Sequence, residues 1–118
     1  MVSGQALPQA DLDRVLRALA DGTRRDIMSR VLGGEEMSVS TLAQSYRMSL
    51  AAVQKHVRVL VQAKLVTKHP QGRERIVRAD PRRLARARLA LAELENIWRL
   101  RHNRLDAVLA EPEPRRTS

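Results

Sequence analysis

Apolar side chains recur with helical spacing in the first part of the chain. In residues 11–19 they fall at positions i, i+3, i+4 and i+7, which predicts an amphipathic helix with Asp11 as its N-cap. A second helix is predicted over residues 24–32, because Asp21 or Thr23 can cap its start and a glycine pair follows its end.

Residues 41–64 carry two short helical patterns separated by the break Arg47-Met48-Ser49, which predicts a helix-turn-helix. Ser49 is a suitable N-cap for the second of these helices. The inward-facing residues are Val39, Leu42, Ala43 and Tyr46 in the first helix, and Val53, Val57, Leu60 and Val61 in the second.

The face of the second helix opposite its apolar stripe has the composition of a DNA-reading surface. Small residues near the helix start would let its backbone approach base edges, while Gln, Lys, His and Arg supply donors to bases and phosphates. The candidate DNA contacts are Ser49, Ala51, Ala52, Gln54, Lys55, His56 and Arg58. The alternative is an ordinary amphipathic helix with a solvated polar face, since a helical hairpin alone does not imply function.

The pattern of residues 65–79 predicts a β-hairpin. Val66, Ile76 and Val77 supply β-branched packing, and Pro70-Gln71-Gly72 supplies the turn. A basic hairpin directly after a recognition helix is typical of a wing that lies on the phosphate backbone. Its candidate phosphate contacts are Lys68, His69, Arg73 and Arg75, with Arg78 also exposed. The alternative is a hairpin whose basic residues only protect its edges.

A long last helix is predicted to start at Asp80-Pro81, an N-cap followed by proline at the first position. Its apolar residues keep a heptad spacing over about four heptads, a pattern that requires a partner helix. We therefore expect a homodimer, with an interface formed by Leu12, Leu84, Ala87, Leu91, Leu94, Trp98, Leu105 and Val108. The alternative is that this helix folds back on its own domain and that Trp98 is ordinary core.

Together these elements predict a mainly α fold with a small β-hairpin, namely a winged helix-turn-helix that dimerises through a long C-terminal helix. The expected parts are a flexible N-terminal arm at 1–9, the winged helix-turn-helix DNA-binding domain at 10–79, the dimerisation helix at 80–110 and a disordered tail at 111–118.

Charge and aromatic content narrow the class of partner. Lys and Arg number 22 against 13 Asp and Glu, a net charge of +9, as expected of a protein that binds a polyanion. One Trp, one Tyr and no Phe cannot form the stacking platform usual in RNA and single-strand readout, so double-stranded DNA is favoured. A basic RNA-binding or ribosome-associated protein is the alternative.

Several other classes find no support in the sequence. It has no signal-peptide pattern and no long apolar run, so we expect a cytoplasmic protein without a membrane segment. No Gly-rich phosphate loop, HExxH or GxSxG motif is present, and we predict no enzymatic activity and no cofactor. Zero cysteines exclude disulfides and thiolate metal sites within the chain.

Two segments carry a family resemblance. Residues 18–27, ALADGTRRDI, resemble the opening of the ArsR/SmtB family of bacterial winged-helix repressors, and residues 53–60, VQKHVRVL, resemble that family's recognition-helix signature. The similarity covers residues 12–79 well and is weaker by motif in the last helix. It implies a homodimer that binds an inverted-repeat operator and represses transcription until a signal releases it.

The sequence departs from the family pattern at three positions. Gly22 stands where the family usually has Pro, which is expected to loosen only a helix start. Gln54 stands where the family usually has Ser, so base preference is expected to differ. Lys64 stands in place of a usual Gly, at the point where the recognition helix must end and where a positive φ is common.

The resemblance also bears on metal sensing. Metal-sensing members carry Cys-Val-Cys on the helix before the turn, where this chain has Ser38-Val39-Ser40, and hydroxyls do not replace thiolate ligands. A second family site uses Asp, His and Glu of the last helix, where this chain offers His102 with Glu93 and Glu95. The three histidines, at 56, 69 and 102, fall in three different predicted elements. We predict no metal site, and the sequence identifies no effector.

Overall fold

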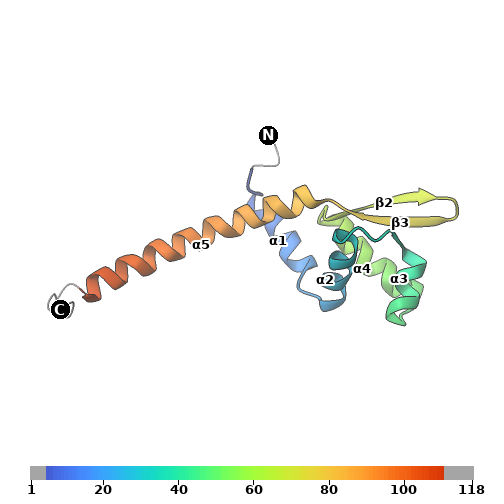
Figure 1. The fold of residues 1–118 in the computed structure, drawn as a ribbon, viewed down its shortest axis with the longest axis horizontal. Helices are drawn as coiled ribbons and strands as arrows, with labels where there is room; N and C mark the ends of the chain where they lie inside the picture. The colour runs from blue at the N-terminus through green and yellow to red at the C-terminus, as the bar shows by residue number, and fades with distance from the viewer. Residues whose placement is uncertain (1–4, 111–118) are drawn as a thin grey trace.

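The computed structural model of the protein describes residues 5–110. In chain order its elements are α1 (Gln9–Ala18), α2 (Gly22–Leu32), β1 (Met37–Ser38), α3 (Val39–Tyr46), α4 (Leu50–Gln62), β2 (Val66–Gln71), β3 (Glu74–Ala79) and α5 (Pro81–Ala110). Figure 1 shows α1 to α4 and the strands gathered into one domain, from which α5 extends away. The mainly helical winged helix-turn-helix with a small hairpin and a long last helix is confirmed.

Helix α4 joins the parts of the domain, because it contacts α1, α2, α3 and β2. Its inward residues Val53, Val57 and Leu60 have no exposed surface. They pack into one core with apolar residues of the other helices and of the hairpin, among them Leu12, Val15, Ile27, Leu42, Leu65, Val66 and Val77. The inner face of α4 is therefore packed into the core, while its opposite face is exposed.

The start of α2 follows its predicted cap, whereas the start of α1 does not. The Asp21 carboxylate accepts a hydrogen bond from the backbone N–H of Arg24 (3.1 Å), so Asp21 is the N-cap of α2. Helix α1 begins at Gln9, directly after Pro8, and the predicted cap Asp11 instead lies in its first turn. There the Asp11 carboxylate pairs with Arg14 (3.1 Å).

The segment before α1 is packed rather than loose. Leu7 is 5% exposed, and its backbone N–H donates to the carbonyl of Arg86 in α5 (3.3 Å). The Arg86 guanidinium in turn donates to the carbonyl of Gln5 (3.0 Å). The flexible arm predicted for residues 1–9 is therefore wrong for residues 5–9, and residues 1–4 lie outside the described range, as does the tail predicted at 111–118.

The sheet contains a strand that the sequence did not suggest. The order is β1-β3-β2, and the two-residue strand β1 pairs antiparallel with β3 through Met37↔Val77 and Ser38↔Ile76. Glu36, just before β1, pairs with Arg78 of β3 (3.2 Å). This contact ties the base of the hairpin to the helical part of the domain.

The hairpin turn lies further along the chain than predicted. Gln71 pairs with Glu74, so Gly72-Arg73 forms the turn. Gly72 has φ +64 at the first central position, where type II′ turns require glycine. Pro70 belongs to β2, and it is tolerated there because β2 is an edge strand of the sheet.

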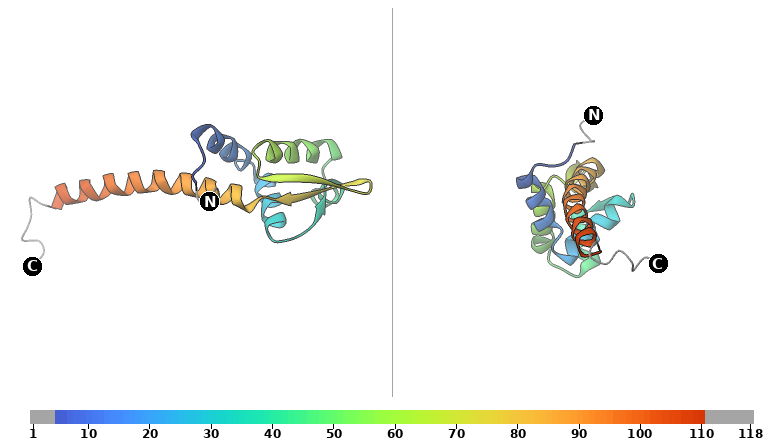
Figure 2. Two further views of the ribbon diagram at one scale, coloured as in Figure 1. Left: turned by 90° about the horizontal axis from the view of Figure 1, so that it is seen from above. Right: turned by 90° about the vertical axis from the view of Figure 1, so that its left-hand side faces the viewer.

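Helix α5 is covered by the domain only over its first turns. Arg83 is buried, and its guanidinium donates to the carbonyl of Ala63 at the end of α4 (3.1 Å). Ala87 and Ala90 are the last buried residues of α5. Beyond them the helix runs away from the domain, on the side opposite the hairpin turn (Figure 2). None of the helices within residues 5–110 combines the length and the apolarity that crossing a bilayer requires.

The predicted interface residues fall into two groups. Leu12 (2% exposed) and Ala87 (3% exposed) belong to the core of the domain, so neither offers a free surface to a partner. Leu84 is half-buried against that core. The exposed members are Leu91, Leu94, Trp98, Leu105 and Val108. Because Trp98 is 63% exposed, the alternative in which it is core of its own domain is wrong.

Lys64 adopts the left-handed conformation suggested by its position, with φ 62. We expect Lys64→Gly to raise the free energy of unfolding by up to about 1 kcal/mol, because glycine reaches positive φ without a Cβ clash. Chemical denaturation measures this change. Lys64→Ala removes the same charge but keeps the Cβ, so this control should show no gain. Destabilisation by glycine would contradict the assignment of strain to Lys64.

Candidate DNA-binding surface

The turn between α3 and α4 is defined by backbone and hydroxyl contacts. Arg47, the residue after the end of α3, has a left-handed φ of 54, and the N–H of Met48 donates back to the carbonyl of Ala43 (3.1 Å). The Ser49 hydroxyl accepts from the N–H of Ala52 (3.1 Å), which confirms Ser49 as the N-cap of α4. These contacts fix the direction in which the recognition helix leaves the turn.

Helix α3 is anchored to α2 by polar contacts around Tyr46. The Tyr46 hydroxyl donates to the Asp26 carboxylate, and the Arg30 guanidinium lies 5.0 Å from the centre of the Tyr46 ring. Arg30 also donates to the Ser45 hydroxyl (2.8 Å). Burial and the bond to Asp26 raise the pKa of Tyr46 to about 12, so the phenol remains a donor at any ordinary pH. These contacts hold α2 and α3 together, and both helices pack against α4.

The outer face of α4 exposes most of its predicted contacts. Ala51, Gln54, Lys55 and Arg58 are exposed, whereas Ala52 is half-buried. Ser49 is exposed as well, although its hydroxyl already caps the helix. Figure 1 shows α4 below the hairpin in that view, in the part of the domain that lies away from the distal part of α5.

His56 differs from the other predicted contacts because it turns toward α2. Its Nδ1 lies 3.2 Å from Arg24 Nη1 and 3.8 Å from the Asp21 carboxylate, and its side chain is 20% exposed. Arg24 also donates to the carbonyls of Arg17 (3.2 Å) and Ala18 (2.6 Å) at the end of α1. The pKa of Asp21 is lowered, chiefly by the N–H of Arg24. His56 thus connects α4 to the junction of α1 and α2 rather than standing free over a groove.

The wing exposes the four predicted phosphate contacts, Lys68, His69, Arg73 and Arg75. The His69 ring lies 2.7 Å from the Thr67 hydroxyl on the same strand. Arg78 is also exposed, but its guanidinium is engaged by Glu36. The wing therefore presents a basic surface whose free charges lie towards its tip.

A hollow of about 410 Å³ separates the wing from the recognition helix. It is lined by Val39, Ser40, Leu50, Gln54, Arg58, Lys68, Arg73, Glu74 and Arg75. The fold thus brings Gln54 and Arg58 of α4 into one surface with three basic side chains of the wing. Lys55 and His69 are not part of this lining.

Leu50 is a member of this surface that the sequence did not reveal. It is the first residue of α4 and is 47% exposed. On a helical wheel Leu50 falls close to the apolar stripe, so the pattern alone would place it inside. The core does not extend to this first turn of α4, and only the three-dimensional arrangement reveals where the core ends.

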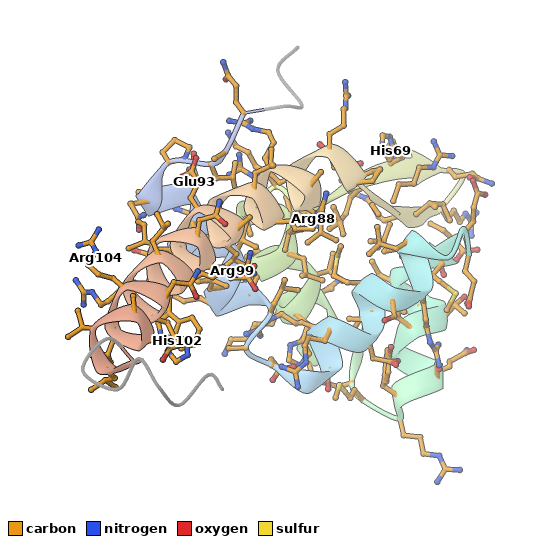
Figure 3. The ribbon with its side chains drawn as sticks, turned by 60° about the vertical axis from the view of Figure 1, so that its left-hand side comes forward. His69, Arg88, Glu93, Arg99, His102 and Arg104 are labelled. Atoms are coloured by element: carbon orange, nitrogen blue, oxygen red, sulfur yellow. The ribbon has the colours of Figure 1, made fainter. Side chains whose placement is uncertain are left out.

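The histidines and carboxylates do not converge on a metal site within the described part of the chain, where no group of three potential ligands occurs. Figure 3 shows His69 on the wing and His102 at the far end of α5. His102 stacks on Trp98 (centroids 4.9 Å apart) and lies 3.4 Å from Asp106. Glu95 pairs with Arg99 (3.0 Å).

Comparison with known sequences agrees with this geometry. A helix-turn-helix domain family matches residues 19–69. The HTH-type transcriptional regulator Rv2034 of Mycobacterium tuberculosis is 41% identical over 86 residues, which cover 73% of this chain and 77% of the relative. The transcriptional repressor SdpR of Bacillus subtilis is 30% identical over 61 residues, or 52% of this chain and 67% of the relative.

Solved structures show the same architecture. An ArsR-like transcriptional regulator from Rhodococcus sp. RHA1 superposes with a TM-score of 0.76 at 29% identity, covering 86% of this chain and 93% of that one. The homodimeric winged helix-turn-helix DNA-binding domain of Mb0332 from Mycobacterium bovis gives a TM-score of 0.57 at 27% identity, with coverage of 84% and 94%. With this fold, this recognition helix and these relatives, the chain belongs to the ArsR family of DNA-binding helix-turn-helix transcriptional regulators, which are not enzymes.

Proposed function

We propose that the protein is a repressor that binds a palindromic operator as a homodimer. The observation that carries the proposal is the apolar face of α5 beyond the domain, where Leu91, Leu94, Trp98, Leu105 and Val108 are all exposed. An apolar stripe of this length on a monomer is unusual and typical of an interaction surface.

A groove next to this stripe extends the same surface onto the domain. It has a volume of about 430 Å³ and lies between α1 and the start of α5. Its lining is almost entirely apolar and comprises Val15, Leu16, Leu19, Pro81, Leu84, Ala85, Ala87, Arg88 and Leu91. A second copy of the chain would cover the groove and the stripe together, and a two-fold dimer would present two recognition helices to two half-sites.

Two relatives support the finer parts of the proposal. SdpR is a transcriptional repressor, and the Mb0332 domain is homodimeric. A symmetric dimer carries two recognition helices related by a two-fold axis. The simplest DNA site for such a dimer has the same two-fold symmetry. Because the proposed target is operator DNA, we expect the protein to act in the cytoplasm of a bacterium.

Genome-wide mapping of bound DNA tests this function. A repressor should return one palindromic motif, and deletion of the gene should raise transcription from promoters that carry it. A basic RNA- or ribosome-associated protein should instead bind structured RNA as tightly as the best DNA sites, with no palindrome. That second outcome would overturn the proposal.

We also expect operator affinity to be indifferent to metals. Zn(II), Ni(II), Cd(II) or arsenite at low micromolar concentration should change it by less than about threefold, because the chain has no cysteine. The Ser38 hydroxyl is moreover already engaged as the cap of α3, where it accepts from the N–H of Thr41 (3.0 Å). Fluorescence anisotropy with labelled operator measures the effect. A release of tenfold or more that a chelator reverses would contradict this expectation.

A further inference from the structure

Leu50 is an apolar side chain in a candidate DNA-binding surface that is otherwise mostly polar and basic. It stands at the start of α4 with about half of its surface exposed, and it lines the hollow between the recognition helix and the wing. Val39 is the other large apolar residue of that lining, and it is itself buried. Leu50 therefore provides the exposed apolar contact of this hollow.

The polar neighbours of Leu50 indicate what enters the hollow. Gln54 and Arg58 follow it at intervals of four residues along one side of α4, and the wing contributes Arg73 and Arg75 from across the hollow. The four-residue spacing places these α4 side chains next to one another on the helix surface. The lining holds the cationic residues Arg58, Lys68, Arg73 and Arg75 against one carboxylate, Glu74, so it is basic overall. Such a surface suits a DNA strand whose phosphates meet the basic side chains and whose base edges meet Leu50.

Thymine provides the matching apolar group. In the major groove each base pair shows donors and acceptors, and the C5-methyl of thymine is the group that apolar side chains contact. The N-terminal residues of a recognition helix are those that reach the base edges. We propose that Leu50 packs against a thymine methyl in each half-site and so helps to determine operator sequence. This inference rests on the proposed operator binding.

The spacing of Leu50 and Gln54 limits where that thymine lies. Side chains four residues apart on a helix have Cβ atoms about 5–6 Å apart, whereas successive base pairs are about 3.4 Å apart. If Gln54 contacts an adenine, the thymine read by Leu50 lies in the same base pair or within about two base pairs of it. The half-site should therefore contain a short A/T segment where the start of α4 docks.

Deoxyuridine substitution tests the contact, because it removes the thymine methyl and leaves base pairing intact. An operator is first selected from random duplexes, and each thymine is then replaced symmetrically in both half-sites. One position should lower affinity of the wild-type protein by about fourfold per half-site, the value of one buried methyl group. Leu50→Ala should bind the unmodified operator with a similar loss and should no longer respond to deoxyuridine at that position.

Two further variants make the result specific to Leu50. Leu50→Met keeps an apolar side chain and should retain sensitivity to the same deoxyuridine. Leu32→Ala shortens another exposed leucine, on α2, and should leave both affinity and deoxyuridine sensitivity unchanged.

The possible failures are distinguishable. If no thymine is sensitive, or if the sensitive thymine remains so in Leu50→Ala, the contact proposed for Leu50 is overturned while operator binding stands. If selection returns no preferred sequence, operator binding itself is overturned and the Leu50 contact falls with it.

Discussion

Leu94→Arg is expected to convert the proposed dimer to a monomer. Leu94 is 48% exposed in the single protomer, so a charge there should leave the domain folded. In a dimer the same guanidinium would be buried without a partner, at a cost on the order of several kcal/mol. Sedimentation velocity should show the monomer, and operator affinity should fall by at least about a hundredfold because the two half-sites are then bound independently.

A matched control lies on the same helix. Asn96 is exposed and falls on the opposite side of α5 from the stripe that contains Leu94 and Trp98. Asn96→Arg adds the same charge in the same turn of the helix and should leave the dimer and its affinity intact. A Leu94→Arg protein that still sediments as a dimer and binds DNA normally would show that the stripe faces something other than a second copy.

The parts of the fold that were predictable from sequence depend on signals that act within one turn of chain. Ser49 caps α4, Gly33 follows the end of α2, and Pro81 is the first residue of α5. In each case the residue type itself favours that position at a helix end. The helix-turn-helix and the exposure of its outer face follow from these helix ends and from the 3.6-residue period of the apolar residues. The candidates Gln54, Lys55 and Arg58 were therefore correctly placed on the outside.

The parts that were missed depend on segments meeting from far apart in the chain. Strand β1 has two residues and exists only because β3 offers it hydrogen-bonding partners. Leu7 is buried by contact with α5, and no local periodicity marks it. His56 sits at the edge of the outer face on a helical wheel, and only the approach of Arg24 decides that it turns away from the groove. The exposure of Leu50 has the same kind of origin, since it depends on where the core ends.

Gln54→Ala and Arg75→Ala are expected to weaken DNA binding in different ways. Gln54 is exposed near the start of α4, where a bidentate contact to adenine is geometrically reasonable. Its truncation should cost about 1–3 kcal/mol on the operator and flatten preference at one base pair in each half-site. Binding to random DNA should change little, because no phosphate contact is lost.

Arg75 lies on the wing, paired in the hairpin with Pro70 and exposed to solvent. Arg75→Ala should weaken operator and random duplexes alike and should lower the slope of log affinity against log salt by about one phosphate contact per protomer. Arg99→Ala removes the same charge on α5, away from the wing (Figure 3), and should leave the slope unchanged.

Titrations of operator and random duplex at several salt concentrations separate the two effects. Because the proposed dimer is two-fold symmetric, the base pairs affected by Gln54→Ala should fall at mirror positions, in half-sites about one helical turn apart or slightly more. If Gln54→Ala weakens specific and random DNA equally, Gln54 is only a backbone contact. Base reading would then belong to its neighbours on the exposed start of α4, Leu50, Ala51 and Lys55, where the same titrations can be repeated.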